Sequence, residues 1–364
     1  MLSKEVRIGL ALSGGGLRAA LYHMGVLKYL AEQSRLEQVT NISTVSGASL
    51  MMSLLFSITG QKWPSSTEYL AMALPEMERV ILNGDLGRTI IGWSEQDPNA
   101  NRVDFLARSL KELWGITGSL QDIVTPPNWY INCATYETGE NFLFTHDYMG
   151  DVKLGYVMHP DIPIAVAVAA SGAYPVACGL YPIDLKSYQW FDDKKGSIPK
   201  TREADSCHLW DGGVYDNLGL EALFNIYYGM KPDIDYLIVS DASEPLRYDT
   251  NVPNDPIQEL TKVWNISTIK QNEFRIQNLY EKVVAEGKGA YFNIGTSAED
   301  ISRKCHVDLY VSNEMISKSM SDEDASYVRD YPTTLETPEE EDLYKIERHG
   351  YEVARNFSYC YGQY

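Results

Sequence analysis

The sequence predicts an α/β protein, a three-layer α/β/α sandwich around a mostly parallel central sheet. Short apolar, β-branched segments alternate with longer segments in which apolar residues recur at helical spacing. Small residues, mainly glycine and serine, follow several of the strand-like segments. Repeated alternation of this kind is typical of a parallel sheet with helices on both faces.

Two strand–turn–helix units open the chain. Residues 6–12 form a short apolar segment of the kind expected for a buried strand, and three consecutive glycines at 14–16 end it. From residue 17 onward, apolar side chains recur at helical spacing. In the second unit, residues 42–45 predict a strand, and the nearly all-apolar residues 50–58 predict a helix buried in the centre of the fold.

The alternation continues through the middle of the chain. A turn at 137–140 joins two predicted strands, and residues 337–340 predict the start of a late helix with Thr337 as its N-cap. The other predicted elements are the strands 129–135, 141–145, 207–210 and 236–240, the helices 103–114 and 217–230, and an apolar, alanine-rich segment at 162–170.

We expect one domain over residues 1–364, because the sequence shows no internal repeat and no Pro- or Ser-rich linker. Two stretches interrupt the alternation and are interpreted as insertions, a helical one at about 60–128 and a loop at about 185–205. The C-terminal segment, about 321–360, is acidic and helical in pattern. An apolar stripe at 105–114 belongs either to the core or to a lid or membrane-docking surface.

Composition excludes some classes of protein. The 364 residues contain 31 Lys and Arg against 50 Asp and Glu, a net charge of −19. This balance argues against nucleic-acid binding and against docking on anionic lipid through a basic patch. The chain has no apolar run of about 18 residues and no signal-peptide pattern after Met1. We therefore expect a cytoplasmic protein, peripheral at the membrane if it contacts one.

The cysteines and histidines indicate neither a disulfide framework nor a metal site. The five cysteines are odd in number and form no CxxC pair, which predicts free thiols in a reducing compartment. The six histidines show no HExxH motif and no paired metal spacing. We expect no metal and no cofactor.

Three motifs could carry chemistry. Residues 14–19 fit GxGxxA, a glycine turn before a helix, which suits a dinucleotide, an anion or oxyanion, or no ligand. Ser46 lies between a predicted strand and helix, as in a nucleophile elbow or as a plain N-cap. Asp211 ends a predicted strand before two glycines, as a turn residue or as a general base. His23 and His208 lie near these motifs, and packing is the simpler role for both.

Together these motifs resemble the patatin-like phospholipases. The resemblance covers roughly residues 6–355, and the two insertions match poorly. The C-terminal residues 331–335 and 350–351 also look like bacterial members. The matching stretches are GGGLR at 14–18 followed by GVL at 25–27, STVSGAS at 43–49, AASGAYP at 169–175 and DGGVYDNLG at 211–219.

The resemblance implies a Ser–Asp dyad, with Ser46 as nucleophile and Asp211 as general base. It implies an oxyanion hole formed by the backbone N–H groups around Gly14, Gly15 and Gly16, and it implies no calcium requirement. Two further sets of residues follow from it: Arg18, which would steady the loop or meet lipid phosphate, and the supporting glycines Gly47, Gly212 and Gly213. The chain departs from the common glycines at Ala19, Thr44 and Ala48.

The expected function is that of a lipid acyl hydrolase, a phospholipase A or lysophospholipase that forms an acyl-enzyme. The expected partner is a phospholipid or lysophospholipid, reached through apolar surface contact with weak salt dependence. One alternative is a catalytically dead sensor or scaffold, or an autoinhibited form that awaits an activating partner or ligand. Another is a nucleotide-binding Rossmann protein that uses residues 14–19.

Overall fold

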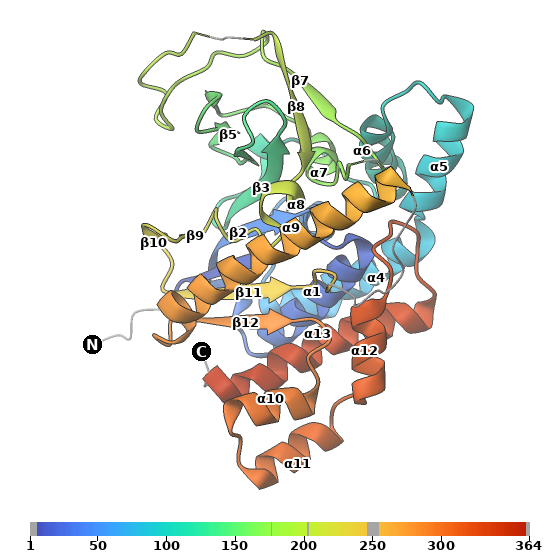
Figure 1. Ribbon diagram of the computed structural model, residues 1–364, viewed down its shortest axis with the longest axis vertical. Helices are drawn as coiled ribbons and strands as arrows, with labels where there is room; N and C mark the ends of the chain where they lie inside the picture. Colours follow the sequence, from blue (N-terminus) through green and yellow to red (C-terminus); the bar gives the residue numbers. More distant parts are fainter. Residues whose placement is uncertain (1–5, 176, 202–203, 246–254, 362–364) are drawn as a thin grey trace.

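A computed structural model describes residues 6–175, 177–201, 204–245 and 255–361 (Figure 1). Strands and helices alternate as the sequence predicts. The strands are β1 Ile8–Leu12, β2 Val39–Val45, β3 Asn128–Thr135, β4 Asn141–Phe144, β5 Tyr148–Asp151, β6 Gly155–Met158, β7 Tyr181–Asp184, β8 Ser206–Asp211, β9 Phe224–Asn225, β10 Gly229–Met230, β11 Tyr236–Asp241 and β12 Gly289–Asn293.

The helices surround the sheet, and most of them lie between residues 60 and 113 or after residue 255. They are α1 Gly16–Glu32, α2 Gly47–Ile58, α3 Ser66–Glu68, α4 Leu74–Asn83, α5 Leu86–Gln96, α6 Arg102–Leu113, α7 Ile164–Ser171, α8 Gly213–Asp216, α9 Pro256–Leu279, α10 Ala298–Cys305, α11 Leu309–Ser317, α12 Asp322–Asp330 and α13 Glu340–Tyr361. Among these helices, none combines the length and the hydropathy that crossing a membrane requires.

The central sheet is mixed, with a parallel half. Its order is β12-β11-β1-β2-β3-β4-β5-β6, and the strands from β12 to β3 run parallel. From β3 onward the neighbouring strands are antiparallel hairpins. This confirms the predicted α/β fold with a mostly parallel core.

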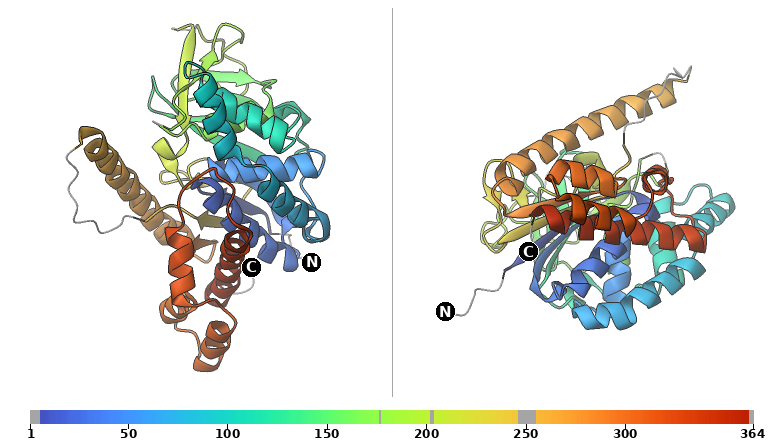
Figure 2. Two further views of the ribbon diagram at one scale, coloured as in Figure 1. Left: turned by 90° about the vertical axis from the view of Figure 1, so that its right-hand side faces the viewer. Right: turned by 90° about the horizontal axis from the view of Figure 1, so that it is seen from below.

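The two faces of the sheet are covered unequally. Side chains alternate along β1, so Leu10 and Leu12 enter the large core under α1, α2 and α13, while Ala11 points to the opposite side. That second core is smaller. It is closed by residues 218–224 and by the C-terminal end of α9 at Leu279. Figure 2 shows α13 and α9 on different sides of the sheet.

The apolar stripe at 105–114 belongs to the core. It lies in α6, which packs on α5 and α7. Leu106 and Leu110 are fully buried, and Trp114 donates its ring N–H to the carbonyl of Gly84. Most of the stripe is therefore core, and Leu113 is its exposed member.

Two local predictions were wrong. The predicted helix 217–230 is instead a turn followed by the β9–β10 hairpin, because Gly219 and Gly229 take positive φ values that a helix does not accept. The late helix begins at Glu340, two residues after the start predicted with Thr337 as N-cap. The side-chain hydroxyl of Thr337 instead donates to the carbonyl of Ile81.

The prediction of five free thiols was also wrong. Cys305 at the end of α10 forms a disulfide with Cys360 near the end of α13, across 55 residues of sequence. Spacing along the chain could not reveal this pair, because it depends on two helices that meet only in the fold. Cys133, Cys178 and Cys207 are free thiols.

Candidate active site

Ser46 occupies a strained turn between β2 and α2. Its φ of 49° and ψ of −116° lie outside the regions that a non-glycine residue usually adopts. The turn also requires glycine beside it, since a Cβ on Gly47 would lie 2.0 Å from the carbonyl oxygen of Gly16. The elbow is therefore pressed against the glycine turn at the start of α1.

Asp211 meets Ser46 because β2 and β8 share one edge of β3. Val45 is paired with Asn132, and Asp211 is paired with Cys133, the next residue along β3. The other edge of β3 is occupied by β4, so β2 and β8 must approach each other end to end. The sequence placed Asp211 at the end of a strand, but it could not show that this strand is antiparallel.

The carboxyl group of Asp211 is almost fully buried, and burial raises its pKa to about 6. Two hydrogen bonds oppose the shift by favouring the charged form, one from the backbone N–H of Gly213 at 2.8 Å and one from the Ser46 side chain. A carboxyl group with this pKa is ionised at neutral pH and is basic enough to accept a proton from a hydroxyl group.

The glycine turn offers backbone N–H groups beside Ser46. Gly15 and Gly16 have φ values of 147° and 61°, which favour glycine. They stand at the N-terminus of α1, where N–H groups have no intrahelical acceptor and the helix dipole attracts negative charge. The N–H of Gly14, in contrast, donates to the carbonyl of Asn217 at 3.0 Å. The candidate oxyanion donors are thus reduced to Gly15 and Gly16.

The guanidinium of Arg18 is held by backbone carbonyls next to the glycine turn. Its side chain is fully buried, and its guanidinium donates to the carbonyls of Tyr331 at 2.5 Å and Ala242 at 3.1 Å. In the same C-terminal segment, the carbonyl of Thr334 accepts the N–H of Leu17. A Cβ on Gly16 would lie 2.5 Å from that same Thr334 oxygen, so the segment fills the space over the turn.

Gly212 and Gly213 allow close approach at the other side of the site. A Cβ on Gly212 would lie 2.5 Å from the carbonyl oxygen of Asn132, and one on Gly213 would lie 2.6 Å from Oδ1 of Asn217. The Asn217 amide also donates to the Ser243 hydroxyl at 2.8 Å. Asn217 therefore joins the two glycine motifs, a role that its place in the sequence motif at 211–219 did not reveal.

A chain of buried hydroxyl groups lies behind the elbow. The Ser46 backbone N–H donates to the Ser171 hydroxyl at 3.0 Å, and that hydroxyl donates to the carbonyl of Asn132 at 2.8 Å. Ser49 lies 3.0 Å from Ser171 and 2.8 Å from Thr44. The ring N–H of Trp129 donates to Thr44 at 2.8 Å.

The directions along this chain are determined by its two ends. The carbonyl oxygen of Asn132 can only accept, so the one hydroxyl proton of Ser171 goes there. Ser49 must then donate to Ser171, and Thr44 must donate to Ser49. Thr44, which stands where relatives commonly have glycine, therefore has a structural role. Its hydroxyl accepts a hydrogen bond from the Trp129 indole and donates one to Ser49, which in turn holds the Ser171 hydroxyl that binds the Ser46 N–H.

The two histidines near the motifs, His23 and His208, make hydrogen bonds to other parts of the fold. Both ring nitrogens of the buried His23 are hydrogen bonded, to the Ser240 hydroxyl and to the Ser13 carbonyl, each at 2.9 Å. Burial lowers the pKa of His23 to about 4. His208 pairs with Glu137 at 2.6 Å. Among the described residues, no histidine makes a hydrogen bond to Ser46 or Asp211.

Comparison with solved structures finds similar folds. Human GIVD cytosolic phospholipase A2 aligns with a TM-score of 0.56 and 15% identity, covering 98% of this chain and 59% of the human chain. The same human enzyme in complex with methyl γ-linolenyl fluorophosphonate and terbium chloride aligns with a TM-score of 0.51 and 13% identity, covering 98% and 58%. The present chain thus spans about three fifths of these relatives.

A search of curated proteins gave no match. A family model described as patatin-like phospholipase matches residues 10–224, more than half of the chain. The matched region includes the glycine turn, Ser46 and Asp211, and its fold agrees with that of the solved structures above. The chain therefore belongs to the patatin-like phospholipase family.

Proposed function

We propose that the protein is a lipid acyl hydrolase that cleaves carboxylic esters of phospholipids or lysophospholipids through a Ser46–Asp211 dyad. The observation that carries this proposal is the meeting of the two residues at one edge of β3. There, the backbone of Ser46 is strained, and its hydroxyl faces the buried carboxyl group of Asp211, whose pKa is about 6. Membership of the patatin-like phospholipase family supports the same chemistry.

The proposed reaction has two steps. The Ser46 hydroxyl attacks the ester carbonyl, Asp211 accepts its proton, and the negative charge on the carbonyl oxygen faces the N–H groups of Gly15 and Gly16. The C–O bond to the leaving alcohol then breaks, and Asp211 returns the proton to that oxygen. A water molecule hydrolyses the acyl-serine in the same way, with Asp211 again as the base.

We also propose that one domain extends beyond the family match. β11 and β12 follow residue 224, yet β11 pairs with β1 in the centre of the sheet. α13 packs on α1, and the segment around Thr334 covers the glycine turn. The C-terminal part thus completes the core and the site, while 60–128 and 185–205 remain proposed insertions.

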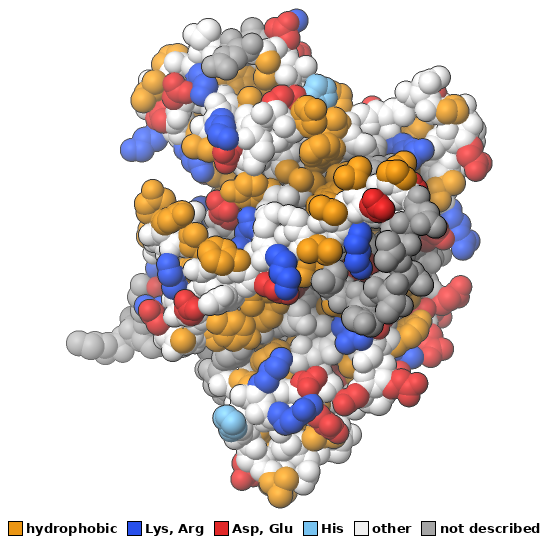
Figure 3. Space-filling model, in the orientation of Figure 1, with side chains coloured by type: hydrophobic (Ala, Val, Ile, Leu, Met, Phe, Trp, Pro, Cys, Tyr) orange, Lys and Arg blue, Asp and Glu red, His pale blue; other side chains and the backbone are white. Residues whose placement is uncertain are grey.

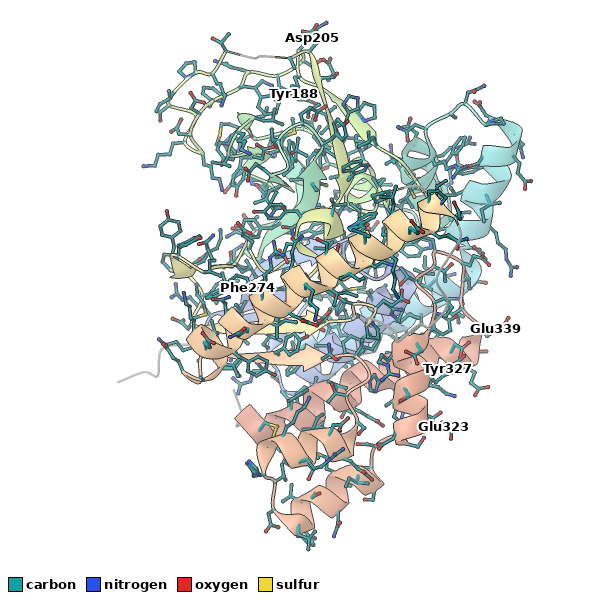
Figure 4. All side chains as sticks on the ribbon, viewed as in Figure 1. Tyr188, Asp205, Phe274, Glu323, Tyr327 and Glu339 are labelled. Carbon is teal, nitrogen blue, oxygen red and sulfur yellow. A yellow bond between two sulfur atoms is a disulfide. The ribbon has the colours of Figure 1, made fainter. Side chains whose placement is uncertain are left out.

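We propose that α9 provides the contact with lipid. Of its 24 residues, only Asn272 and Leu279 are buried, while Leu260 is 69% exposed. Figure 3 shows hydrophobic side chains on the face of the molecule that carries α9. Figure 4 labels Phe274 on the same helix, which is also exposed. The helix adjoins the site, since Trp264 stacks on Tyr174 at 5.5 Å between ring centres, and the carbonyl of the preceding Ala173 accepts the N–H of Asp211. Exposed apolar side chains beside the site would bring lipid to Ser46.

Replacing Leu260 by Asp is expected to weaken binding to zwitterionic phospholipid vesicles severalfold. The change puts a charge where apolar area would enter the lipid. Vesicle sedimentation measures the effect, and hydrolysis of a short-chain soluble ester should be unchanged. Leu309→Asp is the matched control, because Leu309 on α11 is 75% exposed and lies on another helix. Equal loss in both variants would contradict a role for α9.

The proposed function is tested by incubating the protein with mixed phospholipids and lysophospholipids and measuring fatty-acid release by mass spectrometry. Wild-type protein should release free fatty acid and the complementary lysolipid or glycerophospho-alcohol. Ser46→Ala should reduce release to the background rate, because the nucleophile is absent. Release that persists in Ser46→Ala, or a wild type without release in any lipid, would contradict the proposal.

A further inference from the structure

A cluster of two histidines and one carboxylate lies at the far end of the antiparallel half of the sheet. His146 and Asp147 stand in the turn between β4 and β5, and His159 follows β6. The potential ligand atoms of the three side chains all lie within 4.8 Å of one another. Nδ1 of His146 is 2.8 Å from the Asp147 carboxylate.

The backbone holds these two segments together. His159 has a φ of 46°, which is uncommon for a non-glycine residue, and its N–H donates to the carbonyl of Asp147 at 2.8 Å. The side-chain amide of Gln121 donates to the carbonyls of His146 at 2.6 Å and Pro160 at 3.2 Å. The two imidazoles are thus brought edge to face, with 6.3 Å between ring centres.

The donor set matches a particular class of ion. Two imidazole nitrogens and one carboxylate oxygen suit Zn²⁺, which commonly takes three protein ligands and leaves a fourth position for water or another ligand. Tetrahedral zinc with bonds of about 2.1 Å places its ligand atoms about 3.4 Å apart. Side-chain rotations that move the ligand atoms by about 1–2 Å would bring the three groups to that spacing.

Charge also favours a cation here. Asp147 brings a carboxylate to the cluster; its side chain is 65% exposed and lies 2.8 Å from Nδ1 of His146. The cluster faces solvent, so an ion can enter without disturbing the core.

We propose that His146, Asp147 and His159 form a zinc site with one open coordination position. The site is separate from the proposed active site. Because β4 is antiparallel to β3, the chain leaves β4 toward the N-terminal end of β3, whereas Ser46 follows β2 toward the C-terminal end. The histidines stand 13 positions apart in sequence, so the usual motif spacings did not reveal the site.

Isothermal titration of chelator-treated, untagged protein with Zn²⁺ tests the proposal. Wild-type protein is expected to bind about one zinc ion per chain, and His159→Ala is expected to weaken binding at least about tenfold. Co²⁺ as a spectroscopic probe should show the visible absorption bands of a low-symmetry nitrogen–oxygen site in wild type only. Thermal melting confirms that each variant is folded.

The matched control is His208→Ala. His208 is also a partly exposed histidine hydrogen bonded to a carboxylate, Glu137, but among the described residues it belongs to no such cluster of potential ligands. This variant should bind Zn²⁺ as wild type does. The proposal is overturned if wild type takes up no zinc, if His146→Ala and His159→Ala both bind as wild type does, or if His208→Ala loses the same affinity.

Discussion

Replacing Asp211 by Asn is expected to lower kcat/KM for ester hydrolysis about 10³–10⁴-fold, because the base that accepts the Ser46 proton is lost while the shape is kept. The amide can still accept the hydrogen bond from Gly213 N–H. Initial rates with a soluble ester measure the loss without contributions from membrane binding. A variant that retains wild-type activity would remove Asp211 from the mechanism.

The pH dependence of the wild type follows from the same carboxyl group. Burial raises the pKa of Asp211 to about 6, so the group is ionised above that pH and protonated below it. The value of kcat/KM should be level near neutral pH and fall about tenfold per unit below pH 6. A descending limb near pH 4, the range of an exposed carboxyl group, would contradict a buried base.

The Asp211→Asn replacement should raise the stability of the protein at alkaline pH. The folded-state pKa of Asp211 exceeds the ordinary value of 3.8, so folding favours the protonated form. Ionisation therefore costs stability progressively as pH rises from about 4 to 6, by about 3 kcal/mol at most, and the cost remains above that range. Asp211→Asn removes it, and thermal melting at pH 8 should show a higher Tm than wild type.

Asp216→Asn is the matched control for this gain. Asp216 is also buried, but it lies 3.6 Å from the Arg275 guanidinium and accepts the N–H groups of Leu218 and Glu221. Removing its charge leaves Arg275 without this partner, so stability should decrease. A gain in both variants would show that the effect is not specific to Asp211.

Replacing Ser171 by Ala is expected to lower kcat about 10–100-fold with little change in KM, because Ser171 positions the backbone of the nucleophile. The Ser46 N–H would lose its acceptor, and the carbonyl of Asn132 would lose a donor. Leaving such buried groups unpaired also costs about 1–3 kcal/mol of stability. Steady-state kinetics at several substrate concentrations separate kcat from KM.

Two further variants distinguish positioning from general destabilisation. Ser171→Thr keeps the hydroxyl and should recover most of the lost kcat. Ser53→Ala removes an equally buried hydroxyl from α2, but that hydroxyl donates only to the carbonyl of Leu50 in its own helix. Its kcat should remain near that of wild type. Equal losses of kcat in Ser53→Ala and Ser171→Ala would exclude a specific role for the chain of hydroxyl groups.

Much of the fold could be predicted because its signals are local. The strand, glycine turn and helix at 6–32 depend on residues next to one another, as does the elbow at Ser46. Three consecutive glycines after a strand, and a serine between a β-branched strand and an apolar helix, are compatible with few local structures. The same local signals located Asp211 after a strand-like segment.

The remaining features depend on which segments meet in space. The antiparallel direction of β8 follows from its pairing with β3 and leaves no trace in the residues of β8 themselves. The disulfide between Cys305 and Cys360 likewise joins helices that are distant in sequence. At residues 217–230 the sequence predicted a helix, but the glycines at 219 and 229 take positive φ values, and the chain forms a turn and a hairpin.

The support of Ser46 by Ser171 could not be predicted from spacing, although Ser171 stands within a motif of the family resemblance. Its hydroxyl contacts Ser46 in the turn after β2, Ser49 in α2 and Asn132 in β3, and only the folded chain brings these together. Thr44 shows the same limit. As a bulky residue at a glycine position it counted as a departure, whereas its hydroxyl is a link in the buried chain of hydroxyl groups.

Activation of the Ser46 nucleophile by Asp211 can be measured by reacting the protein with a fluorophosphonate probe and mapping the modified peptide by mass spectrometry. We expect a single adduct on Ser46, absent in Ser46→Ala and formed far more slowly in Asp211→Asn. An unlabelled wild type, an adduct on another residue, or labelling of Ser46 at the same rate without the Asp211 carboxylate would contradict the proposed dyad.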